Sequence, residues 1–328
     1  MSMSTLKKGI AVAGTVLVDK INEIAAYPEC GELTKIIGLN KAVGGCVPNV
    51  GIDLKKISPA LDVFAVGKIG ADDDGAYVKS VLSENGVDVS AITVDDSDKT
   101  SFTEVMSVTG GQRTFFTYAG ADGSFTAEDI SFEKTNVKIL HLGYFLLLKK
   151  VDEGEGVPIL KKAIENGVET SIDLVSENSD RYSLVLPCLP YTDYLIINEV
   201  EAGRLTGIEP EESNLKAIAE KLKAMGVRKK VIIHMRDAAL CCSDEGITVV
   251  GSLDIPVSII KGTTGAGDAF CAGALYAIYE NRSDKEILEF ASAVAVMALQ
   301  SADATSGLCE ESKIVEFCKQ FQRKIINW

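Results

Sequence analysis

The residues best suited to chemistry lie in a glycine-rich stretch, Gly262–Asp268, which reads G-T-T-G-A-G-D. An apolar run with Phe270, Ala274 and Ile278 at helical spacing follows, which predicts a loop leading into a helix. Glycine lets backbone N–H groups approach a ligand, and a helix N-terminus carries partial positive charge, so this place suits a phosphate. A carboxylate repels a phosphate unless it takes a proton from an attacking hydroxyl. Asp268 is therefore either a general base or a carboxylate that only stabilises the start of the helix.

This stretch resembles the second signature, D-T-x-G-A-G-D, of the ribokinase-type (PfkB) carbohydrate kinases, although Gly262 stands where that signature has its first Asp. The chain contains no G-x-x-x-x-G-K-[ST] loop, and no G-x-G-x-x-G follows the first expected strand, which argues against two other nucleotide-binding motifs. The resemblance implies that Asp268 is the general base. It also implies that the N–H groups of Gly265, Ala266 and Gly267 stabilise charge on the transferred phosphoryl group.

A second informative stretch contains Gly44, Gly45 and Asn49, a Gly-Gly turn followed by an expected helix. Backbone N–H groups and an amide side chain hydrogen-bond a polyol without adding charge. The stretch is similar to the family's G-G-x-x-x-N, which implies that these three residues hold the sugar. The resemblance further implies that Asp19 holds two sugar hydroxyls, whereas the residues alone equally allow a solvent-facing Asp at a strand end.

A third stretch is an apolar strand that runs into Asn198 and Glu201. It is similar to the family's N-x-x-E, which implies that the pair holds Mg²⁺, largely through the waters of the ion. An ion that retains water and prefers oxygen ligands is suited to one carboxylate and one amide. The alternative interpretation is an N-cap cluster that opens the next helix.

The nucleotide side departs from the resemblance at 234–239, where the family's T-x-G-x-x-G reads H-M-R-D-A-A. A side chain at Arg236 removes the close backbone approach that glycine gives, but its guanidinium suits a phosphate. We therefore expect His234, Arg236 and Thr264 to contact ATP. Many members of the family bind potassium partly through the Asp that is Gly262 here, so we expect any dependence on a monovalent cation to be weakened.

Strand and helix signals alternate from residue 9 to about 300, which predicts an α/β fold with a mainly parallel sheet covered by helices. The strand at 169–173 ends in an Asp at the sheet edge, where open α/β folds bind ligands. The strand at 137–143 is followed by Tyr144 and Phe145, which suit either a substrate site or the core. The resemblance implies a ribokinase-like three-layer sandwich, a single domain over 1–328. A small β lid would come from about 15–40 and 100–118, the latter a hairpin around 109–112.

Composition excludes several classes of partner. The net charge of −14 argues against a nucleic-acid surface and against anionic membranes. The eight cysteines include no C-x-x-C pair and there are only two histidines, so spacing predicts no structural zinc site. The first residues lack the apolar core of a signal peptide, and no segment reaches about 18 apolar residues, so we expect a cytoplasmic protein.

The expected reaction is ATP-dependent phosphorylation of a hydroxyl, most simply a primary one, on a sugar, with ATP, Mg²⁺ and the sugar as ligands. Two alternatives remain open. A nucleoside kinase of the same superfamily would stack a base on Phe115, Phe116 or Tyr118. A non-catalytic ligand-sensing protein would account for Gly262 and the glycine-poor segment 234–239. Pairing of two chains through the lid is a further expectation.

Overall fold

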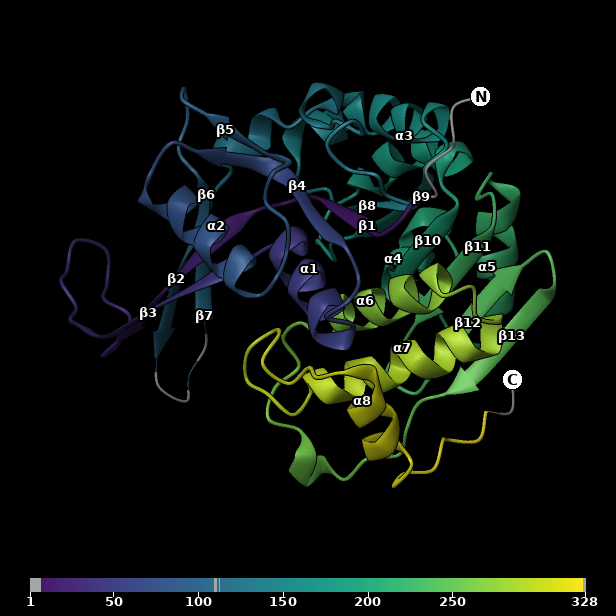
Figure 1. The fold of residues 1–328 in the computed structure, drawn as a ribbon. Helices are drawn as coiled ribbons and strands as arrows, with labels where there is room; N and C mark the ends of the chain where they lie inside the picture. The colour runs from purple at the N-terminus through teal and green to yellow at the C-terminus, as the bar shows by residue number, and fades with distance from the viewer. Residues whose placement is uncertain (1–6, 109–110, 112, 327–328) are drawn as a thin grey trace.

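The computed structural model describes residues 7–108, 111 and 113–326. Nine strands within these residues form one sheet: β1 (Ile10–Gly14), β4 (Val63–Gly70), β5 (Ile92–Asp95), β8 (Ile139–Phe145), β9 (Glu169–Leu174), β10 (Tyr194–Asn198), β11 (Lys230–His234), β12 (Ala238–Ser243) and β13 (Gly246–Gly251). Their order is β13-β12-β11-β10-β9-β8-β1-β4-β5 (Figure 1). The seven neighbouring strands β11, β10, β9, β8, β1, β4 and β5 are parallel, whereas β12 and β13 form an antiparallel edge.

Strand β1 shows why the sheet lies at the centre of the molecule. All five of its residues are buried. Ile10 and Val12 belong to one core cluster, and Ala13 belongs to the other, because successive side chains of a strand point to opposite faces. A strand that is apolar on both faces requires a layer of helices on each side.

Two layers of helices cover this sheet (Figure 1). One core cluster contains residues of α1 (Cys46–Ile57), α2 (Asp73–Glu84), α6 (Ala266–Tyr279), α7 (Asp284–Ala298) and α8 (Glu311–Cys318). The other cluster contains residues of α3 (Gly156–Glu165), α4 (Glu199–Thr206) and α5 (Leu215–Ala224). The result is a three-layer α/β sandwich with a mainly parallel central sheet, which confirms the expected fold class.

Four further strands form a second sheet that projects from the body (Figure 1): β2 (Leu17–Ile24), β3 (Ile36–Gly44), β6 (Ser101–Val108) and β7 (Arg113–Tyr118). Their order is β3-β2-β6-β7, and β2 and β6 are parallel. Strand β3 extends beyond residue 40, the expected limit of its segment, and leads through Gly45 directly into α1. This lid sheet is therefore joined to the helix that carries Asn49. Closure of the lid and a single domain remain predictions.

Strand β8 is longer than the sequence predicts, because it includes Tyr144 and Phe145 rather than ending before them. Its register with β9 shifts between Leu142 and Phe145, and Tyr144 has a left-handed φ of 59°. This irregularity leaves Phe145 in the core, whereas Tyr144 lines a cleft. Of the two interpretations that the sequence left open, the core therefore applies to Phe145 and a place in the candidate site applies to Tyr144.

Two sequence predictions fall on residues that the structure does not describe. The first residues, 1–6, lie outside the described chain, as do positions 109, 110 and 112 of the expected hairpin turn. Strands β6 and β7, on either side of that turn, pair antiparallel. Within the described residues, every helix is too short or too polar to cross a bilayer.

Candidate active site

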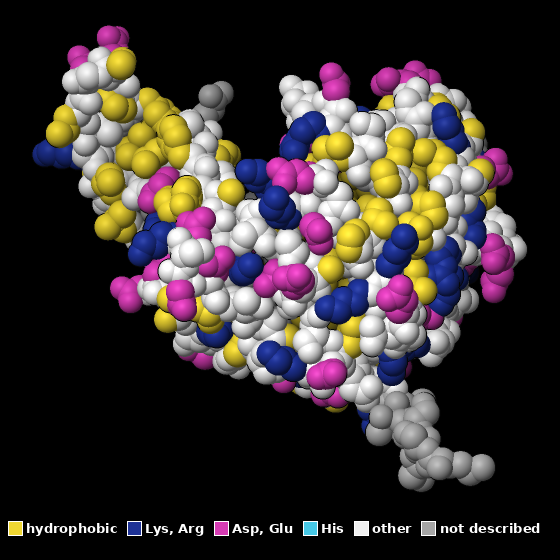
Figure 2. Space-filling view, turned by 90° about the horizontal axis from the view of Figure 1, so that it is seen from above, with side chains coloured by type: hydrophobic (Ala, Val, Ile, Leu, Met, Phe, Trp, Pro, Cys, Tyr) yellow, Lys and Arg dark blue, Asp and Glu magenta, His cyan; other side chains and the backbone are white. Residues whose placement is uncertain are grey.

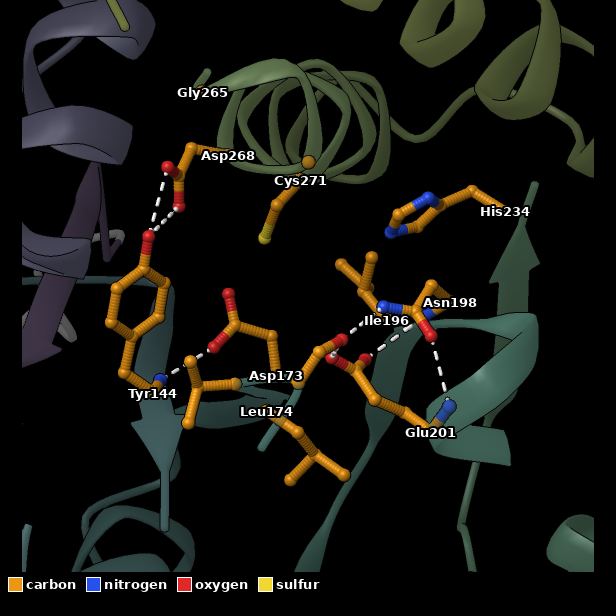
Figure 3. A pocket seen from close by; sticks show the side chains of 13 residues that line it. Tyr144, Asp173, Leu174, Ile196, Asn198, Glu201, His234, Gly265, Asp268 and Cys271 are labelled. Carbon is orange, nitrogen blue, oxygen red and sulfur yellow. Dashed lines mark hydrogen bonds between the residues drawn. The ribbon is translucent and has the colours of Figure 1, made fainter. Parts of the chain in front are cut away.

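The carboxyl ends of β8, β9, β10 and β11 and the start of α6 enclose a cleft of about 220 Å³ (Figure 3). Ligands in open α/β sheets bind at this edge. The residues that line the cleft are Tyr144, Asp173, Leu174, Val175, Ser176, Ile196, Asn198, Glu201, His234, Gly265, Gly267, Asp268 and Cys271. Residues from the predicted catalytic and nucleotide groups therefore share one cavity.

The start of α6 is shaped by Gly265. This residue has a left-handed φ of 76°, and a Cβ atom on it would lie 2.5 Å from the Cα of Ala304. Only glycine permits both the conformation and the close packing. The Ala266 N–H donates to the carbonyl of Thr263 at 3.3 Å, while Gly265 and Gly267 line the cleft. The partly positive end of α6 thus borders the cavity.

Asp268 lies in the first turn of α6 and is only 7% exposed. The Tyr144 hydroxyl donates to its Oδ1 at 2.9 Å, and the Asn49 amide donates to its Oδ2 at 3.0 Å. Burial raises the pKa of Asp268 to about 7; the charge of Asp173 acts in the same direction, and the two hydrogen bonds oppose it. A carboxylate with a pKa near neutrality is suited to accept a proton at physiological pH.

The predicted sugar-binding residues cluster at the junction of the lid and α1. A Cβ atom on Gly44 would lie 2.5 Å from Oδ2 of Asp19, so these two residues touch. Gly45 caps α1 with a φ of 91°. Asn49, one turn further along α1, reaches Asp268 directly. The structure brings Asn49 to the catalytic candidate, whereas Asp19, Gly44 and Gly45 are not among the residues that line the cleft.

Asn198 and Glu201 form the capping box that the alternative interpretation describes. Oδ1 of Asn198 accepts from the Glu201 N–H at 2.9 Å, and Oε2 of Glu201 accepts from the Asn198 N–H at 3.0 Å. The Ser176 hydroxyl donates to Oε1 of Glu201 at 2.8 Å. Burial raises the pKa of Glu201 to about 7. Both side chains nevertheless line the cleft, and each carboxylate oxygen keeps accepting capacity beyond its one protein donor. This donor set fits a hydrated Mg²⁺.

The remaining nucleotide candidates lie in different places. His234 lines the cleft and its ring lies 4.7 Å from that of Phe270. Burial lowers the pKa of His234 to about 4, so the ring is neutral at pH 7 and offers a hydrogen bond rather than a charge. Arg236 and Thr264 are exposed and lie outside the lining residues. Their contact with a nucleotide remains a prediction.

The sequence indicated Tyr144 and Asp173 only by their position and gave them no specific role, yet both belong to the site (Figure 3). Oδ1 of Asp173 accepts from the Tyr144 N–H at 2.6 Å, which holds the left-handed backbone that presents the Tyr144 hydroxyl to Asp268. The available signal for Asp173 was its position at the end of a strand. Tyr144 had no spacing signal, because the irregularity in β8 decides where its side chain points.

The charged side chains in the described lining of the cleft are all acidic. Asp173, Glu201 and Asp268 line it, and its described lining includes no Lys or Arg. Three carboxylates repel a phosphate, so anion binding there depends on the N-terminus of α6 and on an added cation.

Comparison with known proteins identifies the family. The pattern of the pfkB family carbohydrate kinases matches residues 10–311. The chain belongs to this family. This PfkB chain is therefore a carbohydrate kinase, a phosphotransferase with an alcohol as acceptor.

Individual relatives are distant but cover the chain. A ribokinase of Arabidopsis thaliana is 25% identical over 315 residues, covering 94% of this chain and 81% of the relative. The solved structure of Arabidopsis thaliana ribokinase complexed with ribose and ATP has a TM-score of 0.80 at 22% identity, covering 95% and 99% of the two chains. A nucleoside kinase of Methanocaldococcus jannaschii has a TM-score of 0.75 at 18% identity, covering 95% and 98%. The expected ribokinase-like fold is thereby confirmed.

Proposed function

We propose that this PfkB kinase transfers the γ-phosphoryl group of ATP to a hydroxyl of a sugar, and that Asp268 is the general base. The proposal rests on one observation: a buried carboxylate with a pKa of about 7 lies in the first turn of a glycine-started helix that borders the cleft. Such a helix end attracts phosphate, and such a carboxylate accepts a proton. A ribokinase complex with ribose and ATP has the same fold, which supports this pair of substrates.

In the proposed reaction, Asp19, Gly44, Gly45 and Asn49 hold the sugar. Asp268 takes the proton of the acceptor hydroxyl while its oxygen attacks the γ-phosphorus. The bond from that phosphorus to the β–γ bridging oxygen breaks, and ADP leaves. A positioned general base contributes about 10²–10⁴-fold to such a step. The N–H groups of Gly265, Ala266 and Gly267 would stabilise the charge that develops on the transferred group. A primary hydroxyl is the most accessible acceptor.

Asn198 and Glu201 would hold Mg²⁺ largely through its waters. When bound, the ion would neutralise phosphate charge, which the described lining of the cleft, with three carboxylates and no Lys or Arg, does not do. His234 would donate a hydrogen bond to the nucleotide. Gly262, in place of the family's Asp, supports a weakened dependence on monovalent cations.

The direct test is a substrate panel. Purified protein with ATP and Mg²⁺ is offered hexoses, pentoses, phosphosugars and nucleosides, and both ADP release and the phosphorylated product are measured. We expect one sugar class to give a sugar phosphate in amounts equal to the ADP. A preference for adenosine or another nucleoside would instead select the nucleoside kinase, and ADP release without product would contradict both functions.

One observation keeps the nucleoside kinase as a second candidate. Strand β7 exposes Phe115, Phe116 and Tyr118, rings on which a base could stack. The fold does not decide between the two functions, because a nucleoside kinase shares it. The non-catalytic alternative loses support, because Asp268 lies in the cleft and the chain belongs to a kinase family.

We also propose that two chains pair through the lid. Hydrophobic side chains gather on the projecting sheet in Figure 2, and Ile36, Ile37 and Leu39 of β3 are exposed. Burying such side chains against a second copy would stabilise a dimer. Light scattering tests the pairing: a wild-type dimer that Leu39→Lys converts to a monomer supports it, and a wild-type monomer contradicts it.

Replacing Asn49 by Ala is expected to raise the KM for the sugar at least about tenfold and that for ATP less than about threefold. The amide is assigned to the sugar, and it also donates to Asp268, so a fall in kcat should accompany the change. Steady-state kinetics with each substrate varied in turn measures the three constants. Equal increases in both KM values would contradict the assignment of Asn49 to the acceptor.

The pH profile of kcat/KM should follow the ionisation of Asp268. The base acts only when deprotonated, so activity should rise with pH, reach half its maximum near pH 7 and level off above about pH 8. The Tyr144 hydroxyl lowers the pKa of Asp268, so Tyr144→Phe should move the midpoint upward. A wild-type profile that is flat between about pH 5 and 9 would remove Asp268 from the role of base.

A further inference from the structure

Three potential metal ligands lie close together next to the cleft, and one of them lines it. Sγ of Cys46, a ring nitrogen of His141 and a carboxylate oxygen of Asp173 all lie within 4.8 Å of one another. Cys46 begins α1, His141 is in β8 and Asp173 is in β9. Cys46 and His141 are fully buried, and Asp173 lines the cleft. The proposed phosphoryl transfer uses none of these three side chains as a reacting group.

The separation of the histidine nitrogen and the carboxylate oxygen matches that of two ligands in a tetrahedral zinc site. Nε2 of His141 lies 3.3 Å from Oδ2 of Asp173, and Sγ of Cys271 lies 3.5 Å from the same nitrogen. Ligands at zinc bond lengths in a tetrahedron are separated by about 3.4 Å for a nitrogen–oxygen pair and about 3.6 Å for a nitrogen–sulfur pair. Cys271 also lines the cleft and points toward Asp173 in Figure 3, but it does not belong to the group of mutually close ligand atoms formed by Cys46, His141 and Asp173.

Neighbouring groups orient two of the ligands. Nδ1 of His141 lies 3.1 Å from the Ser171 hydroxyl, a contact that fixes the ring and lets Nε2 face Asp173. Oδ1 of Asp173 accepts from the Tyr144 N–H, so the other carboxylate oxygen, Oδ2, is the one that faces the histidine. Outer contacts of this kind fix the tautomer and direction of metal-binding histidines and carboxylates.

Sequence spacing did not predict this cluster, because its members come from α1, β8 and β9 and meet only in the folded chain. The donor set decides which ion it suits. Thiolate and imidazole bind zinc and cadmium, whereas Mg²⁺ prefers six oxygens and retains water. The cluster therefore differs in chemistry from the oxygen pair of Asn198 and Glu201.

We propose that Cys46, His141 and Asp173, with a water as fourth ligand, form a zinc site, and that zinc bound there inhibits phosphoryl transfer. Binding displaces the thiol proton of Cys46 to solvent and forms a sulfur–zinc bond. The ion would enter through the cleft, which Asp173 and Cys271 line. Its positive charge beside the cleft would draw phosphate oxygens away from the start of α6. The inhibition rests on the proposed function, whereas the binding does not.

Titration calorimetry with zinc chloride and the ultraviolet thiolate–cadmium band with cadmium chloride measure the binding. The wild-type chain should bind one zinc ion at this site, with a Kd in the micromolar range or below. Cys46→Ser and His141→Gln should each weaken binding at least about tenfold, because each replaces a zinc ligand by a poor one. Cys188→Ser is the matched control, since Cys188 is also buried but belongs to the other core cluster from Cys46.

Zinc that binds wild type and Cys46→Ser equally, with both chains folded by circular dichroism, would overturn the site. An equal loss in Cys188→Ser would also overturn it. If Cys46→Ser does not fold, His141→Gln and the cadmium band of the wild type decide in its place. Zinc should also reduce sugar phosphorylation at saturating Mg²⁺ at least about tenfold, and binding without inhibition would overturn the inhibitory role. Zinc binding by a chain that phosphorylates no sugar would contradict the proposed function and leave the site standing.

Discussion

The variant Asp268→Asn is expected to lose at least about 100-fold in kcat while its affinities for sugar and ATP stay within a few-fold of wild type. The amide keeps the size of the carboxylate; its oxygen can accept from Asn49 and its NH2 can donate to the Tyr144 hydroxyl, so both contacts keep a partner. It cannot take a proton from the acceptor hydroxyl. Calorimetry gives the two affinities and a coupled assay for ADP gives the turnover. A turnover within a few-fold of wild type would contradict the general-base role.

The stability of the same variant separates lost chemistry from lost folding. Burial raises the pKa of Asp268 in the folded chain to about 7, so the stability that its protonated form contributes is lost as the pH rises through that value. At pH 8 the buried charge opposes folding by roughly 4 kcal/mol. Asp268→Asn removes this charge, so its Tm should exceed that of wild type at pH 8. A lower Tm would mean that the lost activity reflects unfolding.

The second large effect is expected for Gly265→Ala, which should lower kcat at least about 100-fold. An added methyl group would meet the backbone of Ala304 at 2.5 Å, and the left-handed φ of 76° disfavours any side chain. The chain must shift, and the N–H groups at the start of α6 shift with it. Steady-state kinetics with sugar and ATP measures the effect.

Gly246→Ala is the matched control for this change. Gly246 also has a positive φ, of 110°, but an added Cβ would meet nothing within 4 Å, and the residue begins β13, the edge strand of the sheet. Gly246→Ala should therefore have the same cost of placing a side chain at a positive φ as Gly265→Ala, but its kcat should stay that of wild type. Equal losses in both variants would mean that backbone strain, rather than the position of the N–H groups, explains the result.

The sequence predicted the fold because its signals are local. The apolar residues of β1 and the glycine-rich start of α6 each specify their own element, and their alternation along the chain specifies the class. The capping box of Asn198 and Glu201 was likewise legible from a spacing of three residues. These features depend on neighbours in sequence.

The rest of the site depends on contacts between distant residues. Asn49 and Asp268 are 219 positions apart, and their hydrogen bond exists only because α1 packs beside α6. Tyr144 reaches the cleft through an irregular strand that the side chain of Asp173 stabilises. The cluster around His141 forms in the same way. A local pattern of residue types does not encode such contacts between residues that are far apart in the sequence.

The most direct test is the structure of the enzyme with its preferred sugar from the panel and a non-hydrolysable ATP analogue. We predict one sugar hydroxyl within hydrogen-bond reach of Asp268, about 2.6–3.2 Å, with its oxygen facing the γ-phosphorus at the start of α6. A sugar bound elsewhere, or one whose nearest hydroxyl contacts another base while Asp268 touches only Asn49 and Tyr144, would contradict it.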